Sequence, residues 1–248
     1  MPRLQLALLI ALILATGAAR DAFAPGDSQD QNLQKQDTSV TSAQQKSDEP
    51  AATPPRRPPH LSKPRIPPVQ KDHWTPEQKA ILEPFDRQKR LYNVFTTMAN
   101  HPELARDWLV FANHVLRKCT LPPRDREILI LRIGWLCGAE YEWAQHTRIG
   151  KAVGLSDDDL KHIQQGPHAA GASPHDRLLL KAVDELHADS FIGDETWNAL
   201  AETYDTRQMM DLVFAVGQYN LVSMALNSFG VQLDPGLEGF SKENANQK

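Results

Sequence analysis

Two carboxylates and one imidazole stand at spacings that could support proton transfer. Glu127 ends the charged stretch 124–127, and Glu142 and His146 lie in the segment that begins at Glu140. Carboxyl and imidazole groups are the usual general acids and bases of enzymes, and apolar surroundings shift their pKa values. The pattern therefore predicts a catalytic site formed by Glu127, Glu142 and His146.

The spacing of these residues requires a break in the chain. Glu142 and His146 are four residues apart, so on one helix they project from the same face. On a single straight helix, Glu127 would lie roughly 22 Å from Glu142, at about 1.5 Å per residue. Gly138 can take the left-handed conformation that ends a helix, and Gly134 adds flexibility. We therefore expect two helices that fold side by side around Gly138.

Each of these residues also has an ordinary structural interpretation. Glu127 heads an apolar helix, where desolvation would raise its pKa toward neutrality, but it could instead stabilise the helix dipole or pair with a nearby arginine. Glu142 and His146 could form a surface ion pair. In the catalytic interpretation, His146 takes or gives the proton, Glu142 orients it and compensates its charge, and Glu127 is the second acid or base.

Three stretches between about Leu91 and Pro235 resemble the carboxymuconolactone decarboxylase and alkylhydroperoxidase D family. They are RDREILILRIG, EYEWAQHTRIGKAVGLSDDDL and VGQYNLVSMALNSFGV. The resemblance implies an all-α fold and homo-oligomers, often trimers or hexamers. In the peroxidase branch the pattern is a Glu, eleven residues, a Cys-x-x-Cys pair, three residues and a His. Glu127 and His146 match its ends, whereas Ala139 and Glu142 occupy the two cysteine positions.

The missing cysteine pair argues against peroxide reduction and favours lyase-type chemistry. Peroxide reduction needs an attacking thiolate and usually a second thiol. We therefore interpret the chain as a carboxymuconolactone decarboxylase-like lyase that works without cofactor or metal. Its chemistry would be decarboxylation, isomerisation or elimination on a small carbonyl or lactone substrate. Two alternatives stay open: peroxiredoxin activity through Cys137 alone, and a non-catalytic oligomeric scaffold that binds a ligand. The ordinary interpretation of Cys137 is a small hydrophobic residue at a helix end.

Aromatic and amide side chains near these residues are candidates for substrate binding. Trp135, Tyr141 and Trp143 flank the proposed site, and Tyr219 and Asn220 lie in the last apolar helix. Aromatic rings can line a pocket that excludes water and binds a flat or lipophilic ligand, although they are equally typical of a protein core.

The N-terminal part has the composition of an export signal and a linker. Arg3 precedes an apolar run from Leu4 to Ala15, and Ala22-Phe23-Ala24 fits a signal-peptidase site. The run is short against the roughly 20 residues that span a bilayer. We expect a signal peptide over residues 1–24, which would make the protein periplasmic or secreted and would be its only membrane contact. Residues 25–72, rich in Gln and Ser and then in Pro and Arg, are predicted to be a disordered linker.

Residues 73–236 are predicted to form one all-α domain, a compact bundle of about seven or eight helices, followed by a flexible tail over residues 237–248. Polar caps and first-turn prolines mark helix starts, and no alternating strand pattern interrupts them. The last helix is predicted over residues 206–229. The net charge of -4 gives no electrostatic argument for nucleic acid, so a small-molecule substrate is the expected partner.

Overall fold

Short capping sequences set the starts of several helices in the computed structural model, which describes residues 58–240. Thr75, Ser156 and Asp205 each accept a hydrogen bond from the backbone N–H three residues later. The side chain at that later position bonds back to the N–H of the capping residue. This reciprocal arrangement satisfies N–H groups that a helix leaves without partners. It begins α1, α6 and α9.

The described residues form nine α-helices and no strand, which confirms the predicted all-α class. The count exceeds the predicted seven or eight because α2 is short and begins without a capping side chain. The last helix has the bounds that the sequence predicted. The helices are α1 (Pro76–Arg87), α2 (Asn93–Met98), α3 (Pro102–Asn113), α4 (Pro123–Leu136), α5 (Glu140–Ala152), α6 (Asp157–Gln165), α7 (Pro174–Asp189), α8 (Asp194–Ala201) and α9 (Thr206–Phe229).

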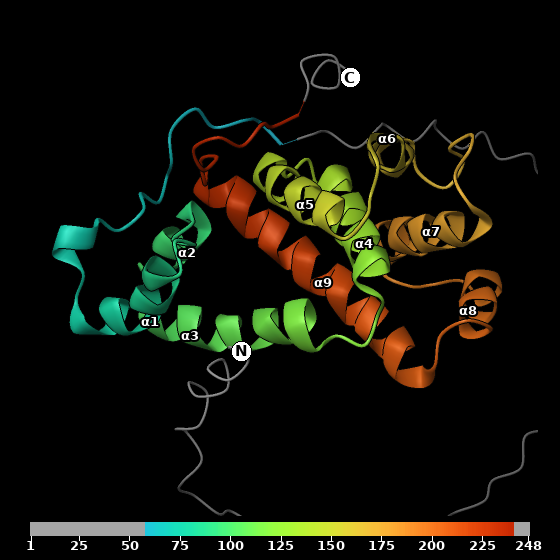
Figure 1. Cartoon of the computed structure of the whole chain (residues 1–248), viewed down its shortest axis with the longest axis horizontal. Helices are drawn as coiled ribbons and strands as arrows, with labels where there is room; N and C mark the ends of the chain where they lie inside the picture. Colours follow the sequence, from blue (N-terminus) through green and yellow to red (C-terminus); the bar gives the residue numbers. More distant parts are fainter. Residues whose placement is uncertain (1–57, 241–248) are drawn as a thin grey trace, which may run out of the picture. The chain divides into compact units, whose positions relative to one another are not determined.

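Helix α4 is the centre of the domain. Every side chain from Ile128 to Ile133 is buried, including the guanidinium of Arg132. Helices α5, α7 and α9 pack against it (Figure 1). A helix that is apolar nearly all round is expected to be buried on all sides. Because α4 also carries Glu127, the candidate site begins inside the hydrophobic core.

Residues 61–69 form an extended segment, here called the strap, that lies against the end of α9. The N–H groups of Arg65 and Ile66 donate to the carbonyl of Phe229 at 2.8 and 3.2 Å. This corrects the prediction of a disordered linker over residues 25–72 for its final part. Composition did not reveal these contacts, because backbone groups make them. The predicted signal peptide and the earlier part of the linker lie outside the described residues.

Residues 231–240, here called the C-terminal segment, connect distant parts of the domain. Asp234 Oδ1 accepts a hydrogen bond from the N–H of Asn93 at 2.8 Å. Its Oδ2 accepts from the Tyr141 hydroxyl and from the Gln145 amide. The predicted domain end at residue 236 is therefore too early, since the segment continues to Phe240, which packs against α4 and α5.

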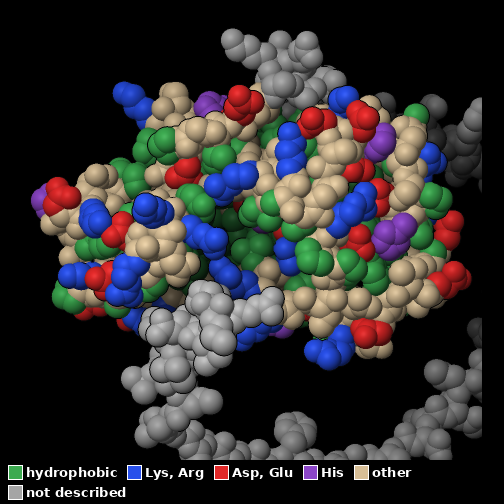
Figure 2. Space-filling view, viewed as in Figure 1, with side chains coloured by type: hydrophobic (Ala, Val, Ile, Leu, Met, Phe, Trp, Pro, Cys, Tyr) green, Lys and Arg blue, Asp and Glu red, His purple; other side chains and the backbone are tan. Residues whose placement is uncertain are grey.

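Helix α9 is the one described helix that is long and apolar enough to cross a membrane by length and composition alone. Half of its most apolar window is buried inside the domain, which fits a core helix. Its outward face carries a row of apolar side chains that are each more than half exposed: Met210, Phe214, Leu221 and Met224. Figure 2 shows hydrophobic side chains in a hollow on one face of the molecule, with Lys and Arg side chains around it.

Candidate active site

The chain reverses direction between α4 and α5, as the sequence predicted. Helix α4 ends at Leu136, Gly138 takes a φ of 60°, and α5 begins at Glu140. This left-handed conformation favours glycine. Gly134 has a different role. A Cβ at this position would lie 3.2 Å from Glu142 Cγ, so its absence lets α5 approach α4 closely.

The reversal brings Glu127, Glu142 and His146 together. His146 Nδ1 lies 2.6 Å from Glu127 Oε2, and its Nε2 lies 3.0 Å from Glu142 Oε1. The second distance fits an ion pair, but the atoms do not meet the geometry of a hydrogen bond. Arg126 donates to Glu127 Oε1 from both Nε and Nη2, at 3.1 and 2.9 Å. The imidazole is thus held between two carboxylates, and a guanidinium holds one of them.

These four groups are all buried, and their charges balance. The exposed fractions are 0% for Glu127, 4% for Glu142, 5% for His146 and 9% for Arg126. Burial alone would lower the pKa of His146, but the carboxylates of Glu127 and Glu142 outweigh it and raise that pKa to about 10. The imidazole is therefore protonated at neutral pH, which gives two positive and two negative groups.

Glu127 has a lowered pKa, and the predicted rise toward neutrality is wrong. Burial does act to raise the pKa of this carboxyl, but the opposing charges of His146 and Arg126 lower it by more. The prediction considered desolvation without the two cations. Since Arg126 occupies one oxygen of Glu127 and His146 the other, Glu127 is suited to orient the imidazole and balance its charge.

Glu142 is the carboxylate whose contact with His146 is an ion pair and not a hydrogen bond. Its Oε1 is buried and makes no hydrogen bond within the part of the chain that the structure describes. Buried polar atoms are normally paired. This oxygen is therefore the place in the site where a proton donor from a substrate could bind. The sequence predicted that Glu142 orients His146, whereas in the structure Glu127 makes the hydrogen-bonded contact with the imidazole.

The predicted substrate-binding aromatic residues separate into two groups. Tyr219 lies against His146, with ring centroids 4.9 Å apart and planes at 78°. Trp135 and Trp143 form a buried pair with centroids 5.3 Å apart. Tyr141 points elsewhere, since its hydroxyl donates to Asp234 in the C-terminal segment. Tyr141 therefore joins distant parts of the fold. Its partner lies 93 residues further along the chain, so nothing in the sequence indicated this role.

Cys137 lies at the end of α4 and donates from its thiol to Asn220 Oδ1 at 3.1 Å. Burial is the main cause that raises the pKa of Cys137 to about 11. The thiol is therefore protonated at neutral pH, when the thiolate is the nucleophilic form. Asn220 is occupied in holding this thiol. Ser223 is fully buried beside Cys137, on the same helix as Asn220, and was not predicted as a site residue.

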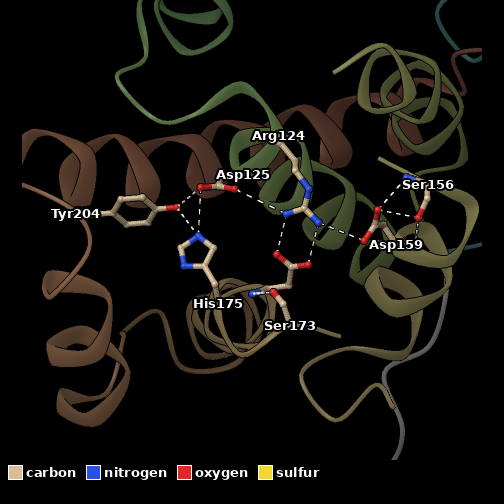
Figure 3. A network of polar contacts seen from close by, with 8 residues as sticks. Arg124, Asp125, Ser156, Asp159, Ser173, His175 and Tyr204 are labelled. Atoms are coloured by element: carbon tan, nitrogen blue, oxygen red, sulfur yellow. Dashed lines mark hydrogen bonds and ion pairs between the residues drawn. The ribbon is translucent and has the colours of Figure 1, made fainter. Parts of the chain in front are cut away.

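A second polar network at the start of α4 was missed by the sequence analysis (Figure 3). Arg124 donates to both carboxylate oxygens of Asp176, at 2.8 and 2.9 Å, and to Asp159 at 3.2 Å. Two parallel hydrogen bonds of this kind are among the stronger charged contacts in proteins. They join α4 to α6 and α7.

Asp125 extends this network toward the connection between α8 and α9. Its Oδ2 accepts a hydrogen bond from the Tyr204 hydroxyl at 2.5 Å and lies 3.2 Å from His175 Nε2. Burial acts to raise the pKa of Asp125, but His175 and Tyr204 hold it below its usual value. We call the contacts of Arg124 and Asp125 the clamp. The charged stretch 124–127 was the only signal for it in the sequence.

The side chains of the site are buried in this structure. Two cavities lie elsewhere, one between α2, α3 and α9 and the other beside Gly138 and Phe240, and neither is lined by the buried polar groups. Over residues 58–240, no group of three or more His, Cys, Asp or Glu side chains is arranged to hold a metal ion.

Comparison with protein families connects this geometry to known proteins. Residues 102–185 match the model of the carboxymuconolactone decarboxylase family. This part of the helical domain, from α3 into α7, is therefore similar to that family. The matched range contains Glu127, Glu142 and His146. No curated protein sequence matches the chain at a significant level.

Solved structures share the fold of this helical domain at low sequence identity. An uncharacterized peroxidase-related protein from Ralstonia eutropha, with an alkylhydroperoxidase AhpD core, has 18% identity and a TM-score of 0.61, covering 69% of this chain and 93% of its own. A peroxidase-related protein from Silicibacter has 15% identity and a TM-score of 0.57, covering 75% and 96%. The debrominase Bmp8, in complex with 2,3,4-tribromopyrrole, has 14% identity and a TM-score of 0.56, covering 68% and 91%.

Proposed function

We propose that this protein, which resembles the carboxymuconolactone decarboxylase family over residues 102–185, is an enzyme that transfers a proton next to a carbonyl or lactone group without a cofactor. The observation that carries the proposal is the buried imidazole of His146 between Glu127 and Glu142, with one carboxylate oxygen left without a hydrogen bond. A purely structural network contributes most to stability when all of its buried acceptors have hydrogen-bond partners. An acceptor that has an ion pair but no hydrogen bond supports a role in binding and reacting.

Glu142 is the proposed base. Its Oε1 takes a proton from the carbon next to the substrate carbonyl, and the electrons of the broken C–H bond pass into an enolate. The protonated His146 balances the charges, and Glu127 with Arg126 keeps the imidazole in position. Return of the proton to another carbon completes an isomerisation. In a decarboxylation, the C–C bond to the substrate carboxylate breaks instead, CO2 leaves, and the bonding electrons form the enolate. The protonated His146 then donates a proton to the enolate carbon.

The test is turnover of small lactones and keto acids by the Glu142→Gln variant. Glutamine keeps the shape of the side chain but cannot take the proton, so turnover should fall roughly 10²- to 10⁴-fold. His175→Gln is the matched control, because it changes a histidine that also contacts a carboxylate but belongs to the clamp. Equal turnover by wild type and Glu142→Gln would remove Glu142 from the reaction.

Peroxide reduction through Cys137 is the alternative within the family. The raised pKa of this buried thiol and the absence of a cysteine at position 139 or 142 oppose it. A peroxide-consumption assay on Cys137→Ser decides the matter, because the alternative requires activity that this change abolishes. The non-catalytic scaffold would gain support if every tested lactone, keto acid and peroxide were left unchanged while a metabolite bound tightly.

The oligomeric state and the location of the protein are further proposals. The exposed apolar row on α9, from Met210 to Met224, supports association with a second copy, since such patches often mark interfaces. Light scattering on Leu221→Glu should then report a smaller particle than the wild type. Export through residues 1–24 is tested by mass spectrometry of the mature N-terminus, where intact residues 1–24 would contradict it.

A further inference from the structure

The ring of Phe240 completes an aromatic cluster beside the site. Its centroid lies 5.1 Å from that of Trp135, with the planes at 88°, and 6.2 Å from that of Trp143. Trp143 follows Glu142 directly and stands about one helical turn before His146. The C-terminal segment therefore places an aromatic ring against Trp135 and Trp143, and the second of these directly follows the proposed base in the chain.

Glu140 holds this ring in place through the backbone. The N–H of Phe240 donates to Glu140 Oε1 at 3.1 Å. A Cβ on Gly239 would overlap the same oxygen, so glycine lets the segment come this close. His60 Nδ1 lies 3.0 Å from the other oxygen of Glu140. A hydrogen-bond donor of a ligand could therefore replace the N–H of Phe240 at Glu140 Oε1.

The space beside Phe240 sets the size of such a ligand. A cavity of about 100 Å³ lies next to this ring and is lined by Glu140, Tyr141 and residues 58–61, among others. An apolar cavity of roughly 150 Å³ binds benzene. The cavity is therefore small for a ring while Phe240 is in place, and the volume that Phe240 would vacate makes it large enough.

We propose that Phe240 occupies a subsite for a single flat ring that carries a hydrogen-bond donor such as a hydroxyl group. The entering ring packs against Trp135 and Trp143, and its donor replaces the N–H of Phe240 at Glu140. A ring that carries a carboxylate instead meets the negative charge of Glu140. The inference rests on the proposed function only in treating the bound ring as part of the substrate.

The experiment is titration of the full chain with phenol, followed by NMR. Phe240→Ala removes the competing ring. Gly239→Ala keeps the Phe240 side chain but should displace it, because the added Cβ would overlap Glu140. Both variants should bind phenol about three- to tenfold more tightly than the wild type, because a competing aromatic contact of ordinary strength is lost. Phe191→Ala, which changes a ring that is 63% exposed, is the control with unchanged affinity.

Two readouts locate the bound ring. The indole N–H signals of Trp135 and Trp143 should shift, and benzoate should bind at least about tenfold more weakly than phenol because of the charge on Glu140. Equal phenol affinity in the wild type and both variants overturns the inference. Shifts confined to the other tryptophans, Trp74, Trp108 and Trp197, also overturn it.

Binding and turnover are separable in this test. Glu142→Gln should bind phenol as the wild type does, since the ring contacts other residues. Tighter binding by Phe240→Ala together with unchanged turnover by Glu142→Gln contradicts the proposed function alone. Lost turnover in Glu142→Gln, with phenol affinity equal in the wild type, Phe240→Ala and Gly239→Ala, contradicts the subsite alone.

Discussion

The four consecutive charged residues at the start of α4 serve two networks that differ in burial. Arg126 and Glu127 face the site, where no side chain of the network is more than about one tenth exposed. Arg124 and Asp125 face the clamp, where the side chains of Arg124 and His175 are 34% and 33% exposed. Neighbouring residues on a helix point in different directions, so one short motif can supply both a reaction centre and a structural contact.

The two networks also differ in how completely their acceptors are used. In both, a carboxyl has a lowered pKa and the histidine beside it a raised one. The carboxylates of the clamp each accept hydrogen bonds. The site contains Glu142 Oε1, which does not. Shifted pKa values alone therefore do not separate a reaction centre from a structural network, and the proposed function rests instead on a buried acceptor without a hydrogen bond.

The largest expected effect on stability comes from breaking the site. Glu127→Gln removes a charge that compensates the buried imidazolium of His146, and loss of one partner from a buried pair costs about 3 to 5 kcal/mol. The free energy of unfolding at pH 7, measured by chemical denaturation, should fall by about that amount. The pKa of His146, followed by NMR, should fall as well. A change below about 1 kcal/mol would mean that the pair contributes little.

A smaller effect is expected from breaking the clamp. Asp176→Asn weakens the paired hydrogen bonds from Arg124, which is partly exposed, so the free energy of unfolding should fall by about 1 to 2 kcal/mol. Turnover should stay within about twofold of the wild type, because the clamp does not touch the proposed base. A tenfold loss of turnover would remove the functional difference between the two networks.

The pH dependence of stability should also separate the two histidines. The folded pKa of His146 is raised to about 10, above its ordinary 6.5. Its contribution is therefore complete below pH 6.5 and is lost as the pH rises through about 10. The pKa of His175 is raised too, so its contribution has the same sign. Each histidine variant should have a lower free energy of unfolding than the wild type at pH 7. As the pH rises to 10, this difference from the wild type should shrink more for His146→Gln than for His175→Gln, as measured by denaturation across that range.

The smallest effect on stability is expected from Gly134→Ala. Alanine favours a helix by up to about 1 kcal/mol over glycine, but its Cβ would press on Glu142 Cγ, so the two effects should nearly cancel. Turnover should fall because the carboxylate moves. Gly217→Ala is the matched control, since a Cβ there meets nothing within 4 Å. Gly217→Ala should be more stable than the wild type and should have the same turnover. Equal turnover in the two variants would show that a larger separation between α4 and α5 does not affect the reaction.

The sequence predicted the features that depend on local chemistry. Caps such as Thr75 and Ser156 gave helix starts, and Gly138 gave the reversal that brings Glu127 to His146. It did not predict features that depend on partners far along the chain. The lowered pKa of Glu127 requires the approach of the His146 cation, and the orientation of Tyr141 requires Asp234. Such pairings appear only after the chain has folded.

The strap has a consequence for where this domain can be cut. The carbonyl of Phe229 accepts from Arg65 and Ile66, and the backbone of Gly230 lies so close to Leu61 that a side chain there would be crowded. A shortened protein starting at residue 73 would leave the end of the longest helix without these partners. The strap thus precedes the first helix in the chain but is hydrogen-bonded to the end of the last helix, α9.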